Sequence, residues 1–377
     1  MKLLVLPGDG IGPEIVNATL AVLDAVDRQF ALGLDYLTRD IGFAALGKFG
    51  TTLPDGIMEL AKGVDGTLLG PISHLGYPPR EKGGINVSAA FRTRLDLFAN
   101  IRPARTRQGV FHRGTEMDLV IMRENTEGMY PDRNMYAGSG EYMPTEDVAI
   151  SMRKVTAKAI ERIARASFDL ARTRRKKVTA VHKANAFVLT DGLFLREVRK
   201  VAAAYPDVEL EEVLVDAMAA LLVRDAGRYD VICTTNFYGD TLSDLASELS
   251  GSLGLAGSLN AGEHHAAAQA QHGSAPDIAG QDRANPVSMI LSAAMLLQWH
   301  GKRSGELRYI DAATSIEETV DHLIADPATR TTDLGGQLGT RAFTQALVEA
   351  LESDRVAIRA LKRPSIVSVQ HVRPAPL

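Results

Sequence analysis

KLLVLPGDGIGPE, residues 2–14, predicts a strand, a turn and the start of a helix in direct succession. Residues 2–6 form an apolar run that is typical of a buried β-strand, and the glycines after them indicate a tight turn. Pro13 favours the first turn of a helix, because its missing N–H group would have no partner there. A strand that leads directly into a helix is the repeating unit of α/β proteins.

The same alternation continues along the chain. Residues 151–173 predict one long helix whose apolar stripe fits either a core helix or an interface helix, and residues 286–299 predict another helix. Residues 251–273 are rich in glycine and alanine and are expected to be a loop over much of their length. The fold class predicted is α/β with a parallel sheet. Further candidate core strands are residues 64–69, 118–122, 177–181 and 229–234.

Length and composition restrict the class of protein. A chain of 377 residues predicts two lobes, and its start shows neither a long apolar run nor a cleavable signal pattern. The net charge of -4 argues against a nucleic-acid partner, and the basic run at residues 172–177 fits a helix end. The single cysteine, Cys233, lies in the apolar run YDVICTTN and is expected to be a buried strand thiol. We therefore expect a cytoplasmic protein without nucleic-acid or membrane partners.

Three aspartates form the sharpest candidate site, namely Asp216 in LVDAMA and the pair Asp240 and Asp244 in FYGDTLSDLAS. If a helix begins at Asp240, the pair lies on one face, where two carboxylates can bind a hard cation such as Mg²⁺ or Mn²⁺. Alternatively, Asp240 is an N-cap residue and Asp244 only complements the helix dipole. The spacing alone leaves both interpretations open.

Other candidates follow the ends of predicted strands. Lys183 in VHKANAF lies where open α/β sheets place their ligand crevice, and desolvation there can lower the pKa of a lysine that acts as a base. Tyr130 in IMRENTEGMY is either a proton donor or an amphipathic core residue. Arg92, Arg102 and Arg123 are candidates for bidentate carboxylate binding. For each of these residues, a surface or core role is the alternative.

Two glycine-containing stretches invite a dinucleotide-binding interpretation. Gly8, Gly10 and Gly12 follow the first strand, but the third glycine is misplaced for the dinucleotide fingerprint, so a tight turn is the better interpretation. HGSAPDIAG, residues 272–280, has small residues that allow phosphates to approach the backbone. Its Asp277 can accept hydrogen bonds from a ribose diol.

Taken together, these segments resemble the isocitrate and isopropylmalate dehydrogenase family, the β-decarboxylating dehydrogenases, from Leu3 to about Leu351. The resemblance implies a two-lobed isopropylmalate dehydrogenase-like fold, not a true Rossmann fold, and a homodimer with shared active sites in the clefts. It divides the chain into a cofactor-binding lobe of residues 1–101 plus 246–362, a substrate, metal and dimerisation lobe of residues 102–245, and an extended tail of residues 363–377. The motifs that carry it are PGDGIGPE, DLFANIRPA, VIMRENTEG, HKAN, VDAMA, GDTLSDLAS and HGSAPDIAG followed by ANP.

The resemblance also implies residue roles. Arg92, Arg102 and Arg123 would bind the carboxylates of a malate, while Asp240, Asp244 and Asp216 of the partner subunit would hold Mg²⁺ or Mn²⁺. Lys183 of the partner subunit would help to remove the hydroxyl proton, and Tyr130 would return a proton after carbon dioxide is lost. For NAD, the diphosphate would meet Gly273, Ser274 and Ala275, and the adenosine would lie near His272 and Asn285. Asp277 with Ile278 resembles the NAD-preferring form, because a carboxylate repels the 2'-phosphate of NADP.

The implied reaction is NAD- and metal-dependent oxidation and decarboxylation of a 3-substituted malate, of the 3-isopropylmalate or isocitrate type, to a 2-oxo acid, CO2 and NADH. Two segments depart from the family pattern. Residues 268–271 read AQAQ where many relatives read FEPV, and INVSAAFR puts Ser88 where isopropylmalate enzymes use leucine, with Asn86 just before it. Polar groups there favour a polar or small substituent, so tartrate or D-malate is the alternative substrate. A non-catalytic regulatory subunit is a further alternative, but such a subunit would lack residues such as Lys183 and Tyr130.

Overall fold

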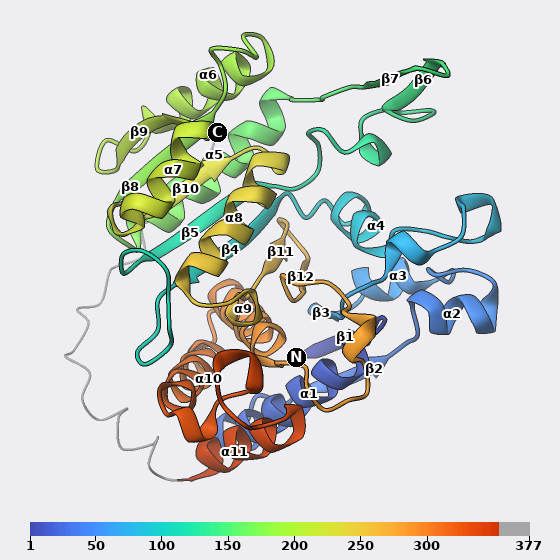
Figure 1. Cartoon of the computed structure of the whole chain (residues 1–377), viewed down its shortest axis with the longest axis vertical. Coiled ribbons are helices and arrows are strands. Elements are labelled where there is room, and N and C mark those ends of the chain that lie inside the picture. The colour runs from blue at the N-terminus through green and yellow to red at the C-terminus, as the bar shows by residue number, and fades with distance from the viewer. Residues whose placement is uncertain (354–377) are drawn as a thin grey trace.

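A ten-stranded mixed sheet runs through the computed structural model, which describes residues 1–353 (Figure 1). Its strand order is β2-β1-β3-β12-β11-β4-β5-β10-β8-β9. Most neighbours are parallel, whereas β11 is antiparallel to both β12 and β4, and β4 is antiparallel to β5. The α/β class is therefore confirmed. The bounds are β1 Lys2–Leu6, β2 Asp35–Thr38, β3 Gly66–Leu69, β4 Ala99–Arg105, β5 Asp118–Glu124, β8 Lys177–His182, β9 Glu209–Leu214, β10 Val231–Thr234, β11 Leu259–Ala261 and β12 Ala266–Ala268.

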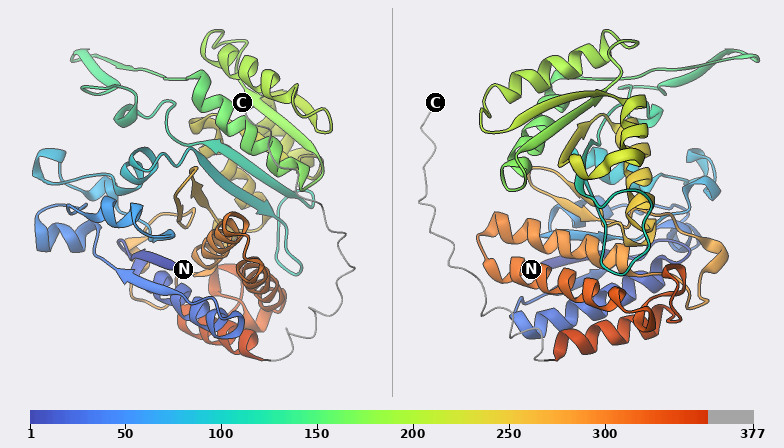
Figure 2. Two further views of the ribbon diagram at one scale, coloured as in Figure 1. Left: turned by 180° about the vertical axis from the view of Figure 1, so that it is seen from behind. Right: turned by 60° about the vertical axis from the view of Figure 1, so that its left-hand side comes forward.

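Helices cover both faces of this sheet (Figures 1 and 2). In the half that contains β5, alternate strand residues point to opposite faces, so Val120 and Met122 pack with α5 and α6, whereas Leu119 and Ile121 pack with α7 and α8. Because both faces of these strands are buried, their sequences are almost continuously apolar. The bounds are α1 Gly12–Phe30, α2 Gly42–Phe49, α3 Ile57–Lys62, α4 Val87–Arg94, α5 Ala157–Arg172, α6 Thr190–Ala202, α7 Val215–Asp225, α8 Asn236–Ser250, α9 Val287–Ser304, α10 Leu307–Ala325 and α11 Thr340–Glu352.

The first strand and the last described helix contribute to one core cluster. Leu3 and Val5 of β1 belong to the same cluster as Phe343 and Leu347 of α11, together with residues of α9 and α10. The division of the chain into two lobes stays a prediction, and residues 354–362 and the expected tail at 363–377 lie outside the described residues. Cys233 is buried in β10 as predicted, and burial raises the pKa of its thiol to about 12. Over residues 1–353, no helix is long and apolar enough to cross a membrane.

The long helix expected over residues 151–173 begins late. Residues Val148–Ser151 are strand β7, which pairs with β6, Glu141–Thr145, in an arm that projects from the molecule (Figures 1 and 2). Helix α5 starts only at Ala157, because the side chain of Thr156 accepts a hydrogen bond from the N–H group of Ala159 and caps it.

The loop expected over residues 251–273 instead contains β11 and β12, which lie in the middle of the sheet. Both strands are fully buried, and buried backbone groups need hydrogen-bond partners, which pairing with β4 and β3 provides. Alanine and glycine have low strand propensity, so the composition predicted a loop where tertiary context decides for strands.

Candidate active site

The glycine turn of residues 7–12 packs against the segment HGSAPDIAG. The N–H group of Ile11 donates to the carbonyl of Ser274 at 2.8 Å. Gly10 has a φ of 58°, and a Cβ atom on it would lie only 2.0 Å from the same carbonyl oxygen. Glycine is therefore required for close contact between two chain segments, which confirms the tight-turn interpretation.

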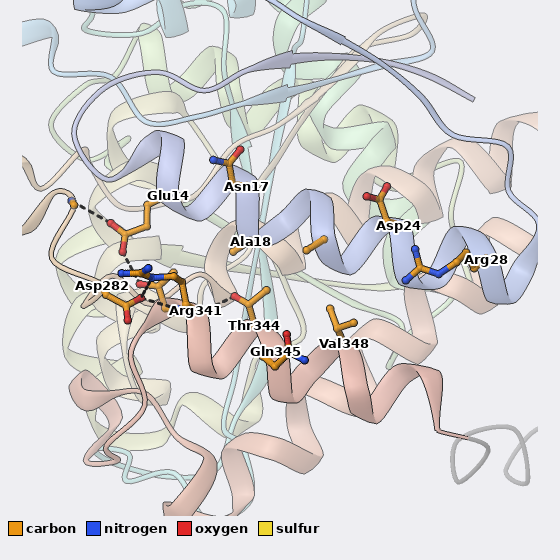
Figure 3. Close-up of a pocket in the computed structure, with 13 residues that line it drawn as sticks. Glu14, Asn17, Ala18, Asp24, Arg28, Asp282, Arg341, Thr344, Gln345 and Val348 are labelled. Carbon is orange, nitrogen blue, oxygen red and sulfur yellow. Dashed lines mark hydrogen bonds and ion pairs between the residues drawn. The ribbon is translucent and has the colours of Figure 1, made fainter.

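Helices α1 and α11 hold the other end of that segment (Figure 3). Glu14 accepts hydrogen bonds from the N–H group of Gly280 at 3.2 Å and from the hydroxyl of Thr340 at 2.9 Å. Asp282 accepts from the N–H group of Arg341 at 2.8 Å. These residues line a cavity of about 740 Å³ between the two helices. Because Glu14 and Asp282 already have protein partners, we assign them the role of anchoring the segment.

A second cavity, of about 950 Å³, brings together most of the residues that the sequence singled out. It lies at the carboxyl end of β5 and beside α4 and α8, where an α/β sheet is expected to bind its ligand. The described residues Lys183, Asp216 and Asp244 do not line it. Its lining includes Ser88, Arg92, Arg102, Arg123, Tyr130, Asp240, His272, Gly273 and Ser274.

Two arginines hold Asp240 inside this cavity. Nη1 of Arg102 donates to Oδ1 of Asp240 at 3.0 Å, and Arg123 donates to the same oxygen. The hydroxyl of Tyr130 donates to Oδ2 at 2.6 Å. Burial alone would raise the pKa of Asp240, but the charges of Arg123 and Arg102 outweigh it and lower the pKa to about 2. Asp240 is therefore ionised at neutral pH.

Arg92 is the uncompensated cation of the cluster. Its guanidinium makes no hydrogen bond or ion pair with any residue in the described part of the chain, and its Nε atom is buried. Burial lowers its pKa well below the usual value for arginine, and the neighbouring charges of Arg123 and Arg102 lower it further. Unpaired buried cations are costly, so the cavity favours an anionic ligand.

Helix α8 carries the aspartate pair. It begins at Asn236 after Thr235, so Asp240 lies in its second turn and the N-cap interpretation is wrong. Asp240 and Asp244 lie on one face, since Nη1 of Arg102 reaches Oδ1 of both, at 3.0 and 3.4 Å. Two neighbouring carboxylates suit a hard divalent cation. Within residues 1–353 of a single chain, no three His, Cys, Asp or Glu side chains gather as a metal site.

Lys183 and Asp216 form a separate pair. Lys183 directly follows β8, as predicted, and its Nζ atom lies 2.7 Å from Oδ1 of Asp216 in the first turn of α7. This hydrogen bond with Lys183 lowers the pKa of Asp216. Large apolar side chains are exposed nearby in sequence, including Val188, which is 68% exposed, and Leu189, which is 86% exposed. Within one chain, the structure thus separates this pair from the arginine-lined cavity.

The segment expected to bind the cofactor has an open backbone. A Cβ atom on Gly273 would meet no atom within 4 Å, and Asp277 is exposed. The hydroxyl oxygens of Ser274 and Ser73 lie 2.7 Å apart and share a hydrogen bond. Ala275 has a φ of 36°, in the left-handed region, and Ile278 is partly buried.

The two residues expected near adenosine are already engaged. Nδ1 of His272 lies 2.9 Å from the carbonyl oxygen of Gly273, and burial lowers the pKa of this histidine. The amide of Asn285 is used twice, as donor to Asp333 at 2.9 Å and as acceptor from the N–H group of Val287 at 3.0 Å. These two bonds use one of the two amide hydrogens and one of the two Oδ1 lone pairs of Asn285, so its side chain can still bond to a ligand.

Three further residues of the site escaped the sequence analysis as functional candidates. Arg133 lines the cavity, and its guanidinium lies 4.9 Å from the centre of the Tyr130 ring. Gln269 donates from Nε2 to Oγ of Ser88 at 2.8 Å, and Gln271 donates to Asp244 at 2.9 Å. The only signal for the two glutamines was the unusual AQAQ segment.

Asn86 adopts a structural role. Its Oδ1 atom accepts a hydrogen bond from the N–H group of Ala89 at 3.1 Å, which caps α4 and satisfies one of the free N–H groups of the first turn. This cap orients the helix that carries Ser88 and Arg92. Asn86 and Ser88 both line the cavity, and Ser88, which accepts from Gln269, still has its hydroxyl hydrogen to donate to a ligand.

An arginine-lined cavity, a carboxylate pair on a helix and an open glycine-containing segment suit an α/β protein that binds a small anionic ligand. The family model described as isocitrate/isopropylmalate dehydrogenase matches residues 2–351, so the chain belongs to this family. It is an oxidoreductase of the dehydrogenase class.

Individual relatives cover almost the whole chain. A 3-isopropylmalate dehydrogenase from Archaeoglobus fulgidus is 40% identical over 352 residues, which are 93% of this chain and 99% of the relative. An isocitrate/homoisocitrate dehydrogenase from Thermus thermophilus is 42% identical over 354 residues, with the same coverage of both chains. The crystal structure of isocitrate dehydrogenase from Methylococcus capsulatus superposes with a TM-score of 0.83 at 40% identity, over 93% of this chain and 99% of that one. These relatives have different substrates in their names.

Proposed function

We propose that this enzyme uses NAD and a divalent cation, Mg²⁺ or Mn²⁺, to oxidise and decarboxylate a 3-substituted malate. The products are a 2-oxo acid, CO2 and NADH. The observation that carries the proposal is the unpaired guanidinium of Arg92 beside Arg102 and Arg123, in a cavity that also contains Tyr130 and Asp240. The two carboxylates of a malate would neutralise this cluster through charge-assisted hydrogen bonds.

The carboxylates of Asp240 and Asp244 fit a hard cation, because both are within reach of one guanidinium nitrogen and Asp240 is ionised at neutral pH. Asp216 of the partner subunit would supply the third carboxylate. When bound, the cation supplies Lewis-acid chemistry at the oxygen of the substrate hydroxyl.

Tyr130 and Lys183 are the proposed proton-transfer residues. Burial raises the pKa of Tyr130, so its phenol is a proton donor at neutral pH and faces the arginine cluster from beside Asp240. Lys183 of the partner subunit would take up the hydroxyl proton. A homodimer is proposed because Lys183 and Asp216 lie outside the cavity of their own chain, and because exposed apolar side chains such as Val188 and Leu189 follow Lys183 closely in sequence. Exposed apolar clusters of this kind mark association surfaces.

NAD is proposed as the cofactor on the open backbone of Gly273, Ser274 and Ala275. The exposed carboxylate of Asp277 is free to accept hydrogen bonds from a ribose diol and would repel a 2'-phosphate. The partly buried Ile278 adds no positive charge that would attract that phosphate.

A second candidate, a tartrate or D-malate dehydrogenase of the same family, is favoured by the contact between Ser88 and Gln269. Their hydrogen bond of 2.8 Å places two polar groups in the cavity wall. Burying an isopropyl group against them would leave polar groups short of partners, whereas a hydroxyl or carboxylate substituent can bond to them.

The test is NADH formation from a panel of malates, with 3-isopropylmalate, isocitrate, tartrate and D-malate as substrates, in the presence and absence of Mg²⁺. We expect metal-dependent NADH formation with at least one member. No turnover with any 3-substituted malate would contradict the proposal and favour a non-catalytic subunit on the same fold. The cytoplasmic location stays a prediction.

A further inference from the structure

The turn that carries Lys183 is held by backbone hydrogen bonds. In the single chain, Phe187, Val188 and Leu189 are exposed, so core packing does not fix residues 185–189. Instead, the carbonyl of Lys183 accepts from the N–H groups of Ala186 and Phe187, at 2.9 and 2.8 Å. The N–H group of Lys183 donates to Oδ2 of Asp191 at 2.5 Å.

Asp191 is completely buried, although it lies only eight residues after Lys183. It sits in the first turn of α6, where the helix dipole favours a carboxylate, and its own N–H group donates to the carbonyl of Phe187 at 3.0 Å. The carboxylate and the turn thus close a ring of hydrogen bonds around residues 183–191. A buried charge is costly unless it is paired.

Arg153 is the partner of this carboxylate. Its Nη1 atom lies 2.7 Å from Oδ1 of Asp191, and the arginine side chain is only 9% exposed. Its guanidinium also donates to Oγ1 of Thr235 at 3.0 Å and lies 4.9 Å from the ring centre of Tyr238. Thr235 and Tyr238 belong to the start of α8, the helix that carries Asp240. Arg153 and Asp191 therefore connect the turn that carries Lys183 to the start of α8 and fix its position relative to that helix.

We propose that the buried pair Arg153–Asp191 is a positioning device for Lys183, which rests on the proton-transfer role of Lys183 under the proposed function. Neither residue contacts the arginine-lined cavity. Loss of the pair should misplace the lysine and slow the chemical step, while substrate and NAD binding, which depend on other elements, should change little. Small displacements of a catalytic group can cost about a hundredfold in rate.

Asp230 provides a matched control. It is also a buried aspartate, its carboxylate pairs with Arg174 at 2.7 Å, and it accepts from the N–H group of Arg175 at 2.8 Å. Asp230 directly precedes β10, and Lys183 directly follows β8, which is the parallel neighbour of β10. The two residues therefore lie at opposite ends of these strands. Asp230→Asn and Asp191→Asn therefore remove equivalent buried charges, one remote from Lys183 and one beside it.

The experiment measures kcat and KM for both variants, for Lys183→Met and for the double variant Lys183→Met/Asp191→Asn. Asp191→Asn should lower kcat by about tenfold to a hundredfold, while the KM for the malate and the KM for NAD stay within about threefold of the wild-type values. Asp230→Asn should keep kcat within about twofold of wild type. Asp191→Asn should add no further loss to Lys183→Met, because both changes act on one group. Equal losses in the two aspartate variants, or full additivity in the double variant, would overturn the inference.

Two further measurements keep the inference testable if Asp191→Asn folds poorly or if activity is absent. Arg153→Gln/Asp191→Asn removes both charges and leaves no lone buried ion, so it should fold and still show the loss of kcat. Amide hydrogen exchange over residues 183–189 should be faster in this variant and unchanged in Asp230→Asn. Unchanged exchange at that turn would overturn the inference. Wild-type activity in Lys183→Met would instead contradict the proposed role of the lysine, and this inference with it.

Discussion

The phenol oxygen of Tyr130 lies 2.6 Å from Oδ2 of Asp240, and Arg123 donates to both of these residues. One arginine therefore holds the proposed proton donor beside a proposed metal ligand. The guanidinium of Arg133 lies over the Tyr130 ring, 4.9 Å from its centre, so contacts hold both the ring and the hydroxyl of Tyr130. The proposed donor is thus held at the wall of the cavity that the malate would occupy.

Replacing Tyr130 with phenylalanine should lower kcat by about a hundredfold to ten-thousandfold, the usual contribution of a positioned acid. The KM values should change much less, because the arginine cluster remains. Steady-state kinetics provide the measurement. Tyr205→Phe is the matched control, since it removes a tyrosine hydroxyl that bonds to Asp169 at 2.8 Å elsewhere in the molecule. A Tyr130→Phe enzyme with the kcat of the control would remove this residue from the proposed mechanism.

Exhaustive chelation should abolish turnover, and Mg²⁺ or Mn²⁺ should restore it. Asp240→Asn should raise the Mg²⁺ concentration needed for half-maximal rate by at least about tenfold, because it removes a charged oxygen ligand. Glu248→Gln, two turns further along α8 and outside the cavity, is the control. The measurement is a metal titration of the initial rate. Full activity in the chelated enzyme would contradict the metal hypothesis.

The cofactor proposal predicts a clear preference for NAD over NADP in kcat/KM. Asp277→Lys should narrow that preference by about tenfold or more, because it exchanges repulsion of the 2'-phosphate for attraction. Gln281→Lys adds a positive charge to the same exposed segment and leaves Asp277 in place, so its effect should be smaller. Paired kinetics with the two cofactors measure this. Equal efficiencies in the unmodified enzyme would count against the role of Asp277.

The polar wall formed by Ser88 and Gln269 predicts that isocitrate, tartrate or malate rivals or exceeds 3-isopropylmalate in kcat/KM. Ser88→Leu should shift the ratio back towards 3-isopropylmalate by about tenfold to a hundredfold, the range for a change of one or two apolar contacts. A strong preference of the unmodified enzyme for 3-isopropylmalate would refute this interpretation of the pocket. The arginine cluster and the carboxylate pair would remain unaffected by that outcome.

Several elements of the site were predictable from local patterns. Asp240 and Asp244 lie four residues apart, which places them on one face of any helix, wherever that helix begins. Lys183 follows a strand, and the carboxyl end of a parallel strand is where a ligand crevice forms. Both features depend only on neighbours in sequence.

Other elements depend on contacts that no local pattern contains. The burial of β11 and β12 in the sheet follows from pairing with distant strands, not from their alanine-rich sequence. The bond between Gln269 and Ser88 joins residues 181 positions apart, and the pairing of Arg153 with Asp191 likewise joins different elements. Motif resemblance predicted candidate site residues, but not these partners.

The central claim, oxidation coupled to decarboxylation, is tested most directly by the ratio of CO2 to NADH. Labelled malates of the panel, with the label in the carboxylate on the substituted carbon, should release CO2 and form NADH in equal amounts, only with the divalent cation present. The Asp240→Asn enzyme should lose both products together. NADH without labelled CO2 would show a simple hydroxy-acid oxidation and contradict the account.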